Sequence, residues 1–66
     1  MKLQKNNYYL IKHNESKVIQ KVFAKEVTEK AYNFEVEKGR YYIGWIEKTE
    51  FNQMYETLER IKETVA

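Results

Sequence analysis

Tyrosine, tryptophan and lysine side chains are the residues of this chain whose types and spacing could support a binding chemistry. Tyrosines form two adjacent pairs, Tyr8-Tyr9 and Tyr41-Tyr42, and Trp45 is the only tryptophan. Aromatic rings stack on the bases of single-stranded nucleic acids with about 1–3 kcal/mol per base, while lysine and arginine contact the phosphates. We therefore take eight residues between positions 8 and 45 as candidates for binding nucleic acid. The candidates are Tyr8, Tyr9, Tyr42 and Trp45 for base stacking, and Lys12, Lys17, Lys21 and Arg40 for phosphate contacts.

The charge is unevenly distributed along the chain. Residues 1–25 carry six lysines and one glutamate, whereas residues 26–66 carry six basic residues and nine glutamates. This asymmetry indicates an anionic partner for the basic part, and lysines that protect strand edges from aggregation are the alternative explanation. Sequence-specific base readout is not expected, because no predicted helix is basic enough to enter a major groove.

Catalytic and metal-binding chemistry is not expected. The 66 residues include no cysteine and no aspartate, and His13 and Ser16 are the only histidine and serine. Without those partners, one chain cannot compose a catalytic triad or a zinc site. The two glycines lie in a predicted turn and a predicted strand, so there is no glycine-rich phosphate loop. The sequence therefore predicts a non-enzymatic protein without a catalytic residue, metal or cofactor.

Aromatic and β-branched segments separated by turn residues predict the strands that position the candidate residues. The predicted strands cover residues 8–13, 17–27, 31–36 and 40–47. The second strand is apolar on both parities, so we expect a bulge or bend near residues 20–22. Gly39 lies in the predicted hairpin turn over residues 37–40, where a positive φ is needed. Both faces of the first and fourth strands carry aromatic residues, so the pattern does not decide which face is open.

The last segment predicts an amphipathic helix that covers one face of the sheet. Thr49 is the expected N-cap, and the core stripe at helical spacing consists of Phe51, Met54, Leu58, Ile61 and Val65. We therefore expect a single α+β domain over residues 1–66. It combines a small, curled, half-barrel-like antiparallel sheet of four strands in chain order with one C-terminal helix.

A stretch in the middle of the chain resembles a known group of small proteins. Residues 26–34, Glu-Val-Thr-Glu-Lys-Ala-Tyr-Asn-Phe, are followed by Trp-Ile-Glu-Lys-Thr at residues 45–49. This pattern resembles small proteins of phages and mobile elements of low-GC bacteria, which carry Glu-Thr-Glu-Lys-Ala and, after a hairpin, Trp-Ile-Pro-Lys-Ser. Glu47 and Thr49 depart from that pattern. The resemblance implies a phage or mobile-element origin, in a group of which some members are encoded among replication and recombination functions.

One helix covers only one face of so small a sheet, so some rings stay exposed or are covered by a partner. Single-stranded nucleic acid, DNA or RNA, is the leading expected ligand. The alternative is a protein-binding module that uses the same aromatic surface or a strand edge, as an inhibitor or accessory subunit of a larger bacterial or phage protein. A homodimer that buries the free face is the third possibility.

We expect a complete cytosolic protein with no membrane partner. No apolar stretch approaches the roughly 18 residues of a membrane span. Residues 1–7 lack the apolar run of a secretory signal, and a chain without cysteine suits a reducing compartment.

Overall fold

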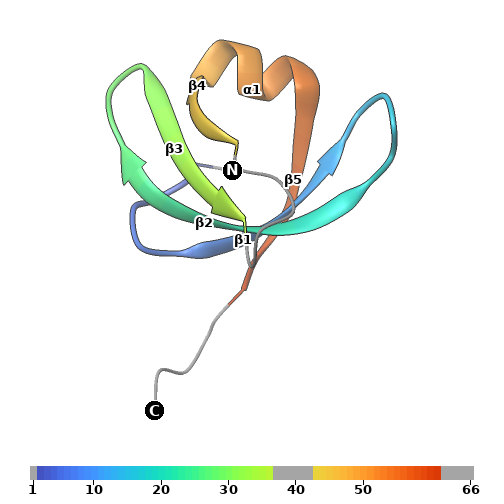
Figure 1. Cartoon of the computed structure of the whole chain (residues 1–66), viewed down its shortest axis with the longest axis horizontal. Coiled ribbons are helices and arrows are strands. Elements are labelled where there is room, and N and C mark those ends of the chain that lie inside the picture. The colour runs from blue at the N-terminus through green and yellow to red at the C-terminus, as the bar shows by residue number, and fades with distance from the viewer. Residues whose placement is uncertain (1, 37–42, 62–66) are drawn as a thin grey trace.

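The computed structural model describes residues 2–36 and 43–61. Within these ranges the chain forms five strands and one helix (Figure 1): β1 (Tyr8–His13), β2 (Ile19–Val27), β3 (Ala31–Val36), β4 (Gly44–Glu47), α1 (Lys48–Met54) and β5 (Tyr55–Ile61). The strands make one sheet in the order β4-β3-β2-β1-β5, and each neighbouring pair is antiparallel. The predicted α+β class with an antiparallel sheet is confirmed.

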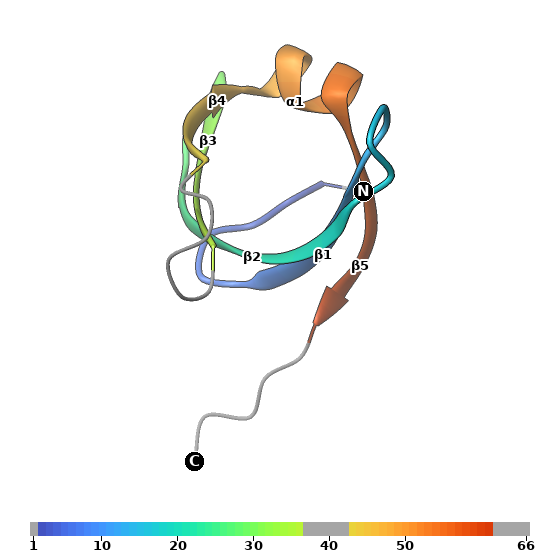
Figure 2. The ribbon, with the colours of Figure 1, turned by 45° about the vertical axis from the view of Figure 1, so that its right-hand side comes forward.

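The sheet is strongly curled and remains open (Figure 2). Its two edge strands, β4 and β5, are joined directly by α1, which bridges them at one end of the curl. The strand register shifts between Leu10 and Ile11 and again between Ala24 and Glu26. Bulges bend a strand and increase its twist, so these two positions help the sheet to curl. The prediction near residues 20–22 is a bulge or a bend. The bulge is wrong in position, because β2 pairs with β1 in continuous register there and its register shift with β3 lies between Ala24 and Glu26.

The hydrophobic core lies on the inner, concave side of the sheet. Alternation along each strand turns every second side chain inward. Phe51 from α1 adds a ring to this core, with centroids 5.1 Å from Phe34 and 5.3 Å from Tyr55. The buried hydrophobic residues are Leu3, Tyr9, Ile11, Val22, Ala24, Tyr32, Phe34 and Phe51.

Tyr32 is the core residue with a perturbed titration. Its ring lies 5.4 Å from that of Phe51, and Lys48 Nζ lies 5.2 Å from the Tyr32 ring centroid. Burial raises the pKa of Tyr32 above 10.0, and the nearby Tyr9 raises it further, while a backbone hydrogen bond with Leu3 acts in the opposite direction. The fold therefore favours the neutral phenol.

The structure confirms three predicted neighbour relations, from β1 through β2 and β3 to β4. The bounds of β1 and β3 are those predicted, whereas β2 begins at Ile19 and not at residue 17. The structure describes the fourth strand from Gly44 onward. The predicted hairpin turn over residues 37–40 lies outside the described residues.

The prediction for the C-terminal segment is wrong beyond Met54. The helix has seven residues, and residues 55–61 form β5, a fifth strand paired with β1. Glu47 occupies the N-cap position, so Thr49 does not cap the helix. Leu58 is 39% exposed and does not belong to the core.

The physical reason for this error is that residues 51–61 fit both periods. Phe51, Leu58 and Ile61 satisfy helical spacing, while Tyr55 and Thr57 alternate inward as a strand requires. The open edge of β1 decides between them, because pairing along it satisfies backbone groups that a helix would leave unpaired. Val65 lies outside the described residues. Within those residues no helix is long and apolar enough to cross a membrane.

Candidate nucleic-acid interface

The outer face of β1 and β2 gathers three of the predicted site residues. Side chains directly opposite each other in an antiparallel ladder share a face, and Tyr9 and Ile11 between them point into the core. Six outward residues therefore form one continuous surface, which we call the outer patch: Tyr8 opposite Phe23, Leu10 opposite Lys21, and Lys12 opposite Ile19. The patch combines aromatic, apolar and cationic side chains on two adjacent strands.

Tyr8 contacts two other residues of the outer patch, Phe23 and Lys21. Its centroid lies 4.8 Å from that of Phe23 at an interplanar angle of 46°. Lys21 Nζ lies 4.7 Å from the Tyr8 centroid, in a cation–π arrangement. Tyr8 is half-buried, so part of its ring remains accessible beside the cation of Lys21.

The other two candidate lysines differ in their surroundings. Lys12 lies opposite Glu56 of β5, whose carboxylate offsets part of its positive charge. Lys17 is exposed in the turn between β1 and β2 and has a φ of 66°. Backbone hydrogen bonds fix this turn, since Lys17 N donates to the His13 carbonyl and His13 N donates to the Val18 carbonyl, both at 2.9 Å.

Tyr9 does not belong to the accessible surface, so its assignment to base stacking is wrong. It is 1% exposed, because its parity on β1 places it inside the curl. Gln4 N donates a hydrogen bond to Tyr9 Oη at 2.7 Å, which satisfies the buried hydroxyl. Arg40 and Tyr42 lie outside the described residues.

Trp45 lies on the outer face but apart from the outer patch. It is opposite Asn33 of β3 and is 58% exposed, the most exposed of the large hydrophobic side chains described. Strands are about 4.8 Å apart in a sheet, so β4 and β1, separated by β3 and β2, are roughly 14 Å apart. Tyr8 and Trp45 are therefore two separate candidate positions for base stacking.

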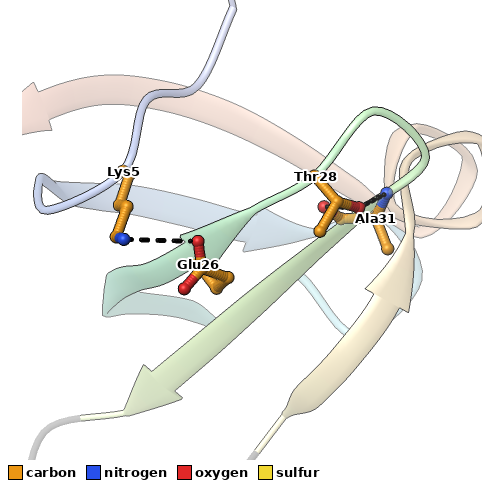
Figure 3. Close-up of polar contacts among 4 residues, drawn as sticks. All are labelled: Lys5, Glu26, Thr28 and Ala31. Atoms are coloured by element: carbon orange, nitrogen blue, oxygen red, sulfur yellow. Dashed lines mark hydrogen bonds and ion pairs between the residues drawn. The ribbon is translucent and has the colours of Figure 1, made fainter.

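Acidic residues between these positions are paired with lysines. Lys25 Nζ lies 3.2 Å from Glu35, and Lys5 Nζ lies 3.4 Å from Glu26 (Figure 3). All four side chains are about half exposed, so each pair contributes little to stability. The pairs do, however, offset the negative charge that this part of the face would otherwise present to a phosphate.

Sequence reasoning did not include Phe23, Glu56 and Asn33 among the candidate residues of the outer face. Phe23 and Glu56 enter it through the strand register, which the sequence does not contain. Asn33 carried a local signal, because it is the one amide inside the otherwise apolar or acidic strand β3.

A second feature is a hollow of about 290 Å³ at the far end of the β1–β2 hairpin, beside the start of β5. His13 Nδ1 accepts hydrogen bonds from the Glu15 and Ser16 backbone N–H groups, both at 3.2 Å, which leaves the proton of a neutral imidazole on Nε2. The His13 and Tyr55 rings meet edge to face at 5.1 Å. The lining residues are His13, Ser16, Val18, Gln20 and Tyr55.

Asn14 fastens this hairpin to the end of α1. Its backbone N–H donates to the Met54 carbonyl and its Nδ2 donates to the Gln53 carbonyl, each at 2.8 Å. These bonds satisfy two carbonyls at the helix C-terminus. They also hold the two sides of the hollow in place.

Comparison of the chain with protein-family models, with curated proteins and with solved structures finds no match in any of the three. Among residues 2–36 and 43–61, no three histidine or glutamate side chains are grouped in a way that could hold a metal ion. Inference about function therefore rests on the arrangement of the outer face itself.

Proposed function

We propose that this chain is a non-enzymatic protein that binds single-stranded nucleic acid through the outer face of its sheet. The observation that carries the proposal is the register of β1 and β2, which sets the Tyr8 ring, Lys21 and Lys12 side by side. Trp45 supplies a second, more exposed ring on the same face. Rings and cations in this arrangement suit bases and phosphates without selecting a sequence.

In this proposal, one base stacks on Trp45, another meets the accessible part of Tyr8, and the phosphates follow the lysines. Each stacked base contributes about 1–3 kcal/mol. The lysines at the phosphate positions are Lys12, Lys17 and Lys21. Because phosphate contacts release counterions, affinity falls steeply as salt rises.

Fluorescence anisotropy with a labelled oligonucleotide of about 12 nucleotides, within the range of roughly 4–16 nucleotides bound by small single-strand modules, tests this proposal. The variant Lys17→Glu/Lys21→Glu is expected to lose at least about tenfold in affinity at low salt. The control Lys2→Glu/Lys30→Glu has the same change in charge at exposed positions away from the outer patch. It is expected to lose much less.

Circular dichroism of both variants confirms that each remains folded. Equal losses in the two variants would show that only net charge matters and would remove the outer patch from the proposal. A wild-type protein that does not bind the oligonucleotide at low salt would remove the proposal itself.

The hollow beside His13 favours a second candidate function, a module that docks on a larger bacterial or phage protein. Val18 at the rim of the hollow is 53% exposed. The hydrogen bonds from Asn14 to the Met54 and Gln53 carbonyls hold the sides of the hollow in place before any partner binds. A partner side chain that fills the hollow is expected to bind with little dependence on salt. Capture of one host or phage protein at moderate salt by the wild type, and its loss with Val18→Lys, would favour this function.

The phage or mobile-element origin implied by the resemblance and the cytosolic location stay predictions. Sedimentation of the free protein tests the homodimer. A monomer at working concentration leaves the outer face available to the nucleic acid.

A further inference from the structure

Asn33 is a buried amide whose oxygen has no hydrogen-bond partner in the part of the chain that the structure describes. It lies on β3, inside the sheet, and is 8% exposed. Its Oδ1 is buried and finds no hydrogen-bond partner among the described residues. An unpaired acceptor that is shut off from water destabilises a fold, whereas leucine of similar size would fill the site without that cost. This residue therefore requires a reason other than stability.

Asn33 has two cross-strand neighbours on the outer face, Glu26 and Trp45, and they differ in their contacts. Glu26, opposite it on β2, is held by Lys5 at 3.4 Å (Figure 3). Trp45, opposite it on β4, is 58% exposed, and no ring contact, ion pair or hydrogen bond to a described residue restrains its indole. Of these two neighbours Trp45 is the one that can move, and its rotation is the route by which we expect a ligand to reach Asn33.

A ligand that fits both residues has a flat ring that stacks on indole and an N–H group at the edge of that ring. Nucleobases have this form. The amino groups of adenine, cytosine and guanine donate at the ring edge, and asparagine pairs with adenine in two bonds, through N6–H and N7. Thymine carries no amino group and accepts through O4.

We propose that Trp45 and Asn33 form a site for one base that prefers bases with an amino group, adenine first. This inference rests on the proposed single-strand binding and adds a base preference to it. The base stacks on Trp45 as the indole swings outward, and its amino group donates to Asn33 Oδ1. Binding then satisfies an acceptor that the free protein leaves unpaired, and thymine at the same place leaves it unpaired.

The preference is limited to what one or two hydrogen bonds supply. A net hydrogen bond of about 0.5–1.5 kcal/mol corresponds to roughly 2- to 12-fold in affinity. We therefore expect a tract of deoxyadenosine to bind several-fold more tightly than a tract of thymidine, beyond any difference that Asn33 does not cause.

The experiment compares deoxyadenosine and thymidine oligonucleotides of equal length on the wild type and on Asn33→Leu. The variant is expected to melt at a higher temperature than the wild type, to bind the thymidine tract as the wild type does, and to lose the preference for deoxyadenosine. Asn52→Leu makes the same change on the exposed surface of α1 and is expected to keep the preference.

An unchanged preference in a folded Asn33→Leu variant overturns the inference and leaves the proposed function standing, because both oligonucleotides still bind. Failure of the wild type to bind either one overturns the proposed function instead. If Asn33→Leu does not fold, Trp45→Leu decides the question, since its side chain lies outside the core. Loss of the preference in Trp45→Leu supports the site, and a retained preference overturns it.

Discussion

The two faces of the sheet are built from the same strands and have opposite properties. On the inner face Ile11, Val22 and Phe34 are 0% exposed. On the outer face Ile19 is 54% exposed and Trp45 is 58% exposed, while Asn33 Oδ1 has no hydrogen-bond partner among the described residues. The comparison shows a division within β1, β2 and β3, in which inward residues form the core and outward residues, apart from Asn33, keep part of their side chains exposed.

The largest effect is expected from Phe51→Ala, on the inner face. Phe51 is 1% exposed and contacts both Phe34 and Tyr55. Removing a buried phenylalanine ring costs about 3–5 kcal/mol. A chain of this length has a total stability of roughly 3–10 kcal/mol, so this loss is a large share of it. Urea denaturation should show a much lower midpoint for the variant, or no folded baseline if the wild type lies near the lower end of that range. A loss below about 1 kcal/mol would mean that α1 does not close the core.

A smaller effect is expected from Tyr32→Phe, and the part of it that depends on pH appears only under alkaline conditions. Because burial raises the pKa of Tyr32 above 10.0, the folded protein holds the phenol proton more firmly than the unfolded chain does. Stability from this difference is complete below about pH 10 and is lost as pH rises through the folded pKa. The measurement is the free energy of unfolding at neutral pH and above about pH 10. Between these two pH values the free energy of unfolding of Tyr32→Phe should fall less than that of the wild type. Equal falls would contradict the raised pKa of Tyr32.

The smallest effect is expected from Leu58→Ala, on the outward side of β5. Leu58 is 39% exposed, so its truncation leaves no enclosed cavity and should cost less than about 1 kcal/mol. If Leu58 instead lay on a helix and packed in the core, the same substitution would cost about 2–5 kcal/mol of stability. Thermal unfolding of the variant therefore separates the strand from the helix, and a loss in the larger range would favour the helix.

Regular alternation made β1 and β3 predictable. In β3 the residues Tyr32, Phe34 and Val36 share one parity, and that parity faces the core. The segment from Tyr55 to Ile61 was not predictable in the same way, because its apolar residues fit the spacing of a helix as well as the alternation of a strand. Only the neighbouring edge of β1, which comes from the other end of the chain, decides between the two.

The candidate site was predictable in residue types and less so in arrangement. Tyr8 and Tyr9 are adjacent, and the sequence alone does not say which ring points outward. The pairing of Tyr9 with Val22 places that ring inside, together with Ile11. The gap between Trp45 and the outer patch likewise depends on strand order, which brings β2 and β3 between them.

The pairing of β1 with β5 also has a consequence for synthesis of the protein. Tyr8 lies opposite Ile61, so the second edge of β1 is paired only after β5, far along the chain, has been synthesised. At about 5–20 residues per second, this interval lasts roughly 2–10 s. During it, the nascent chain exposes the backbone edge of an aromatic strand, which is the feature that leads strands of different chains to associate. Release from this risk comes only when translation has passed Ile61.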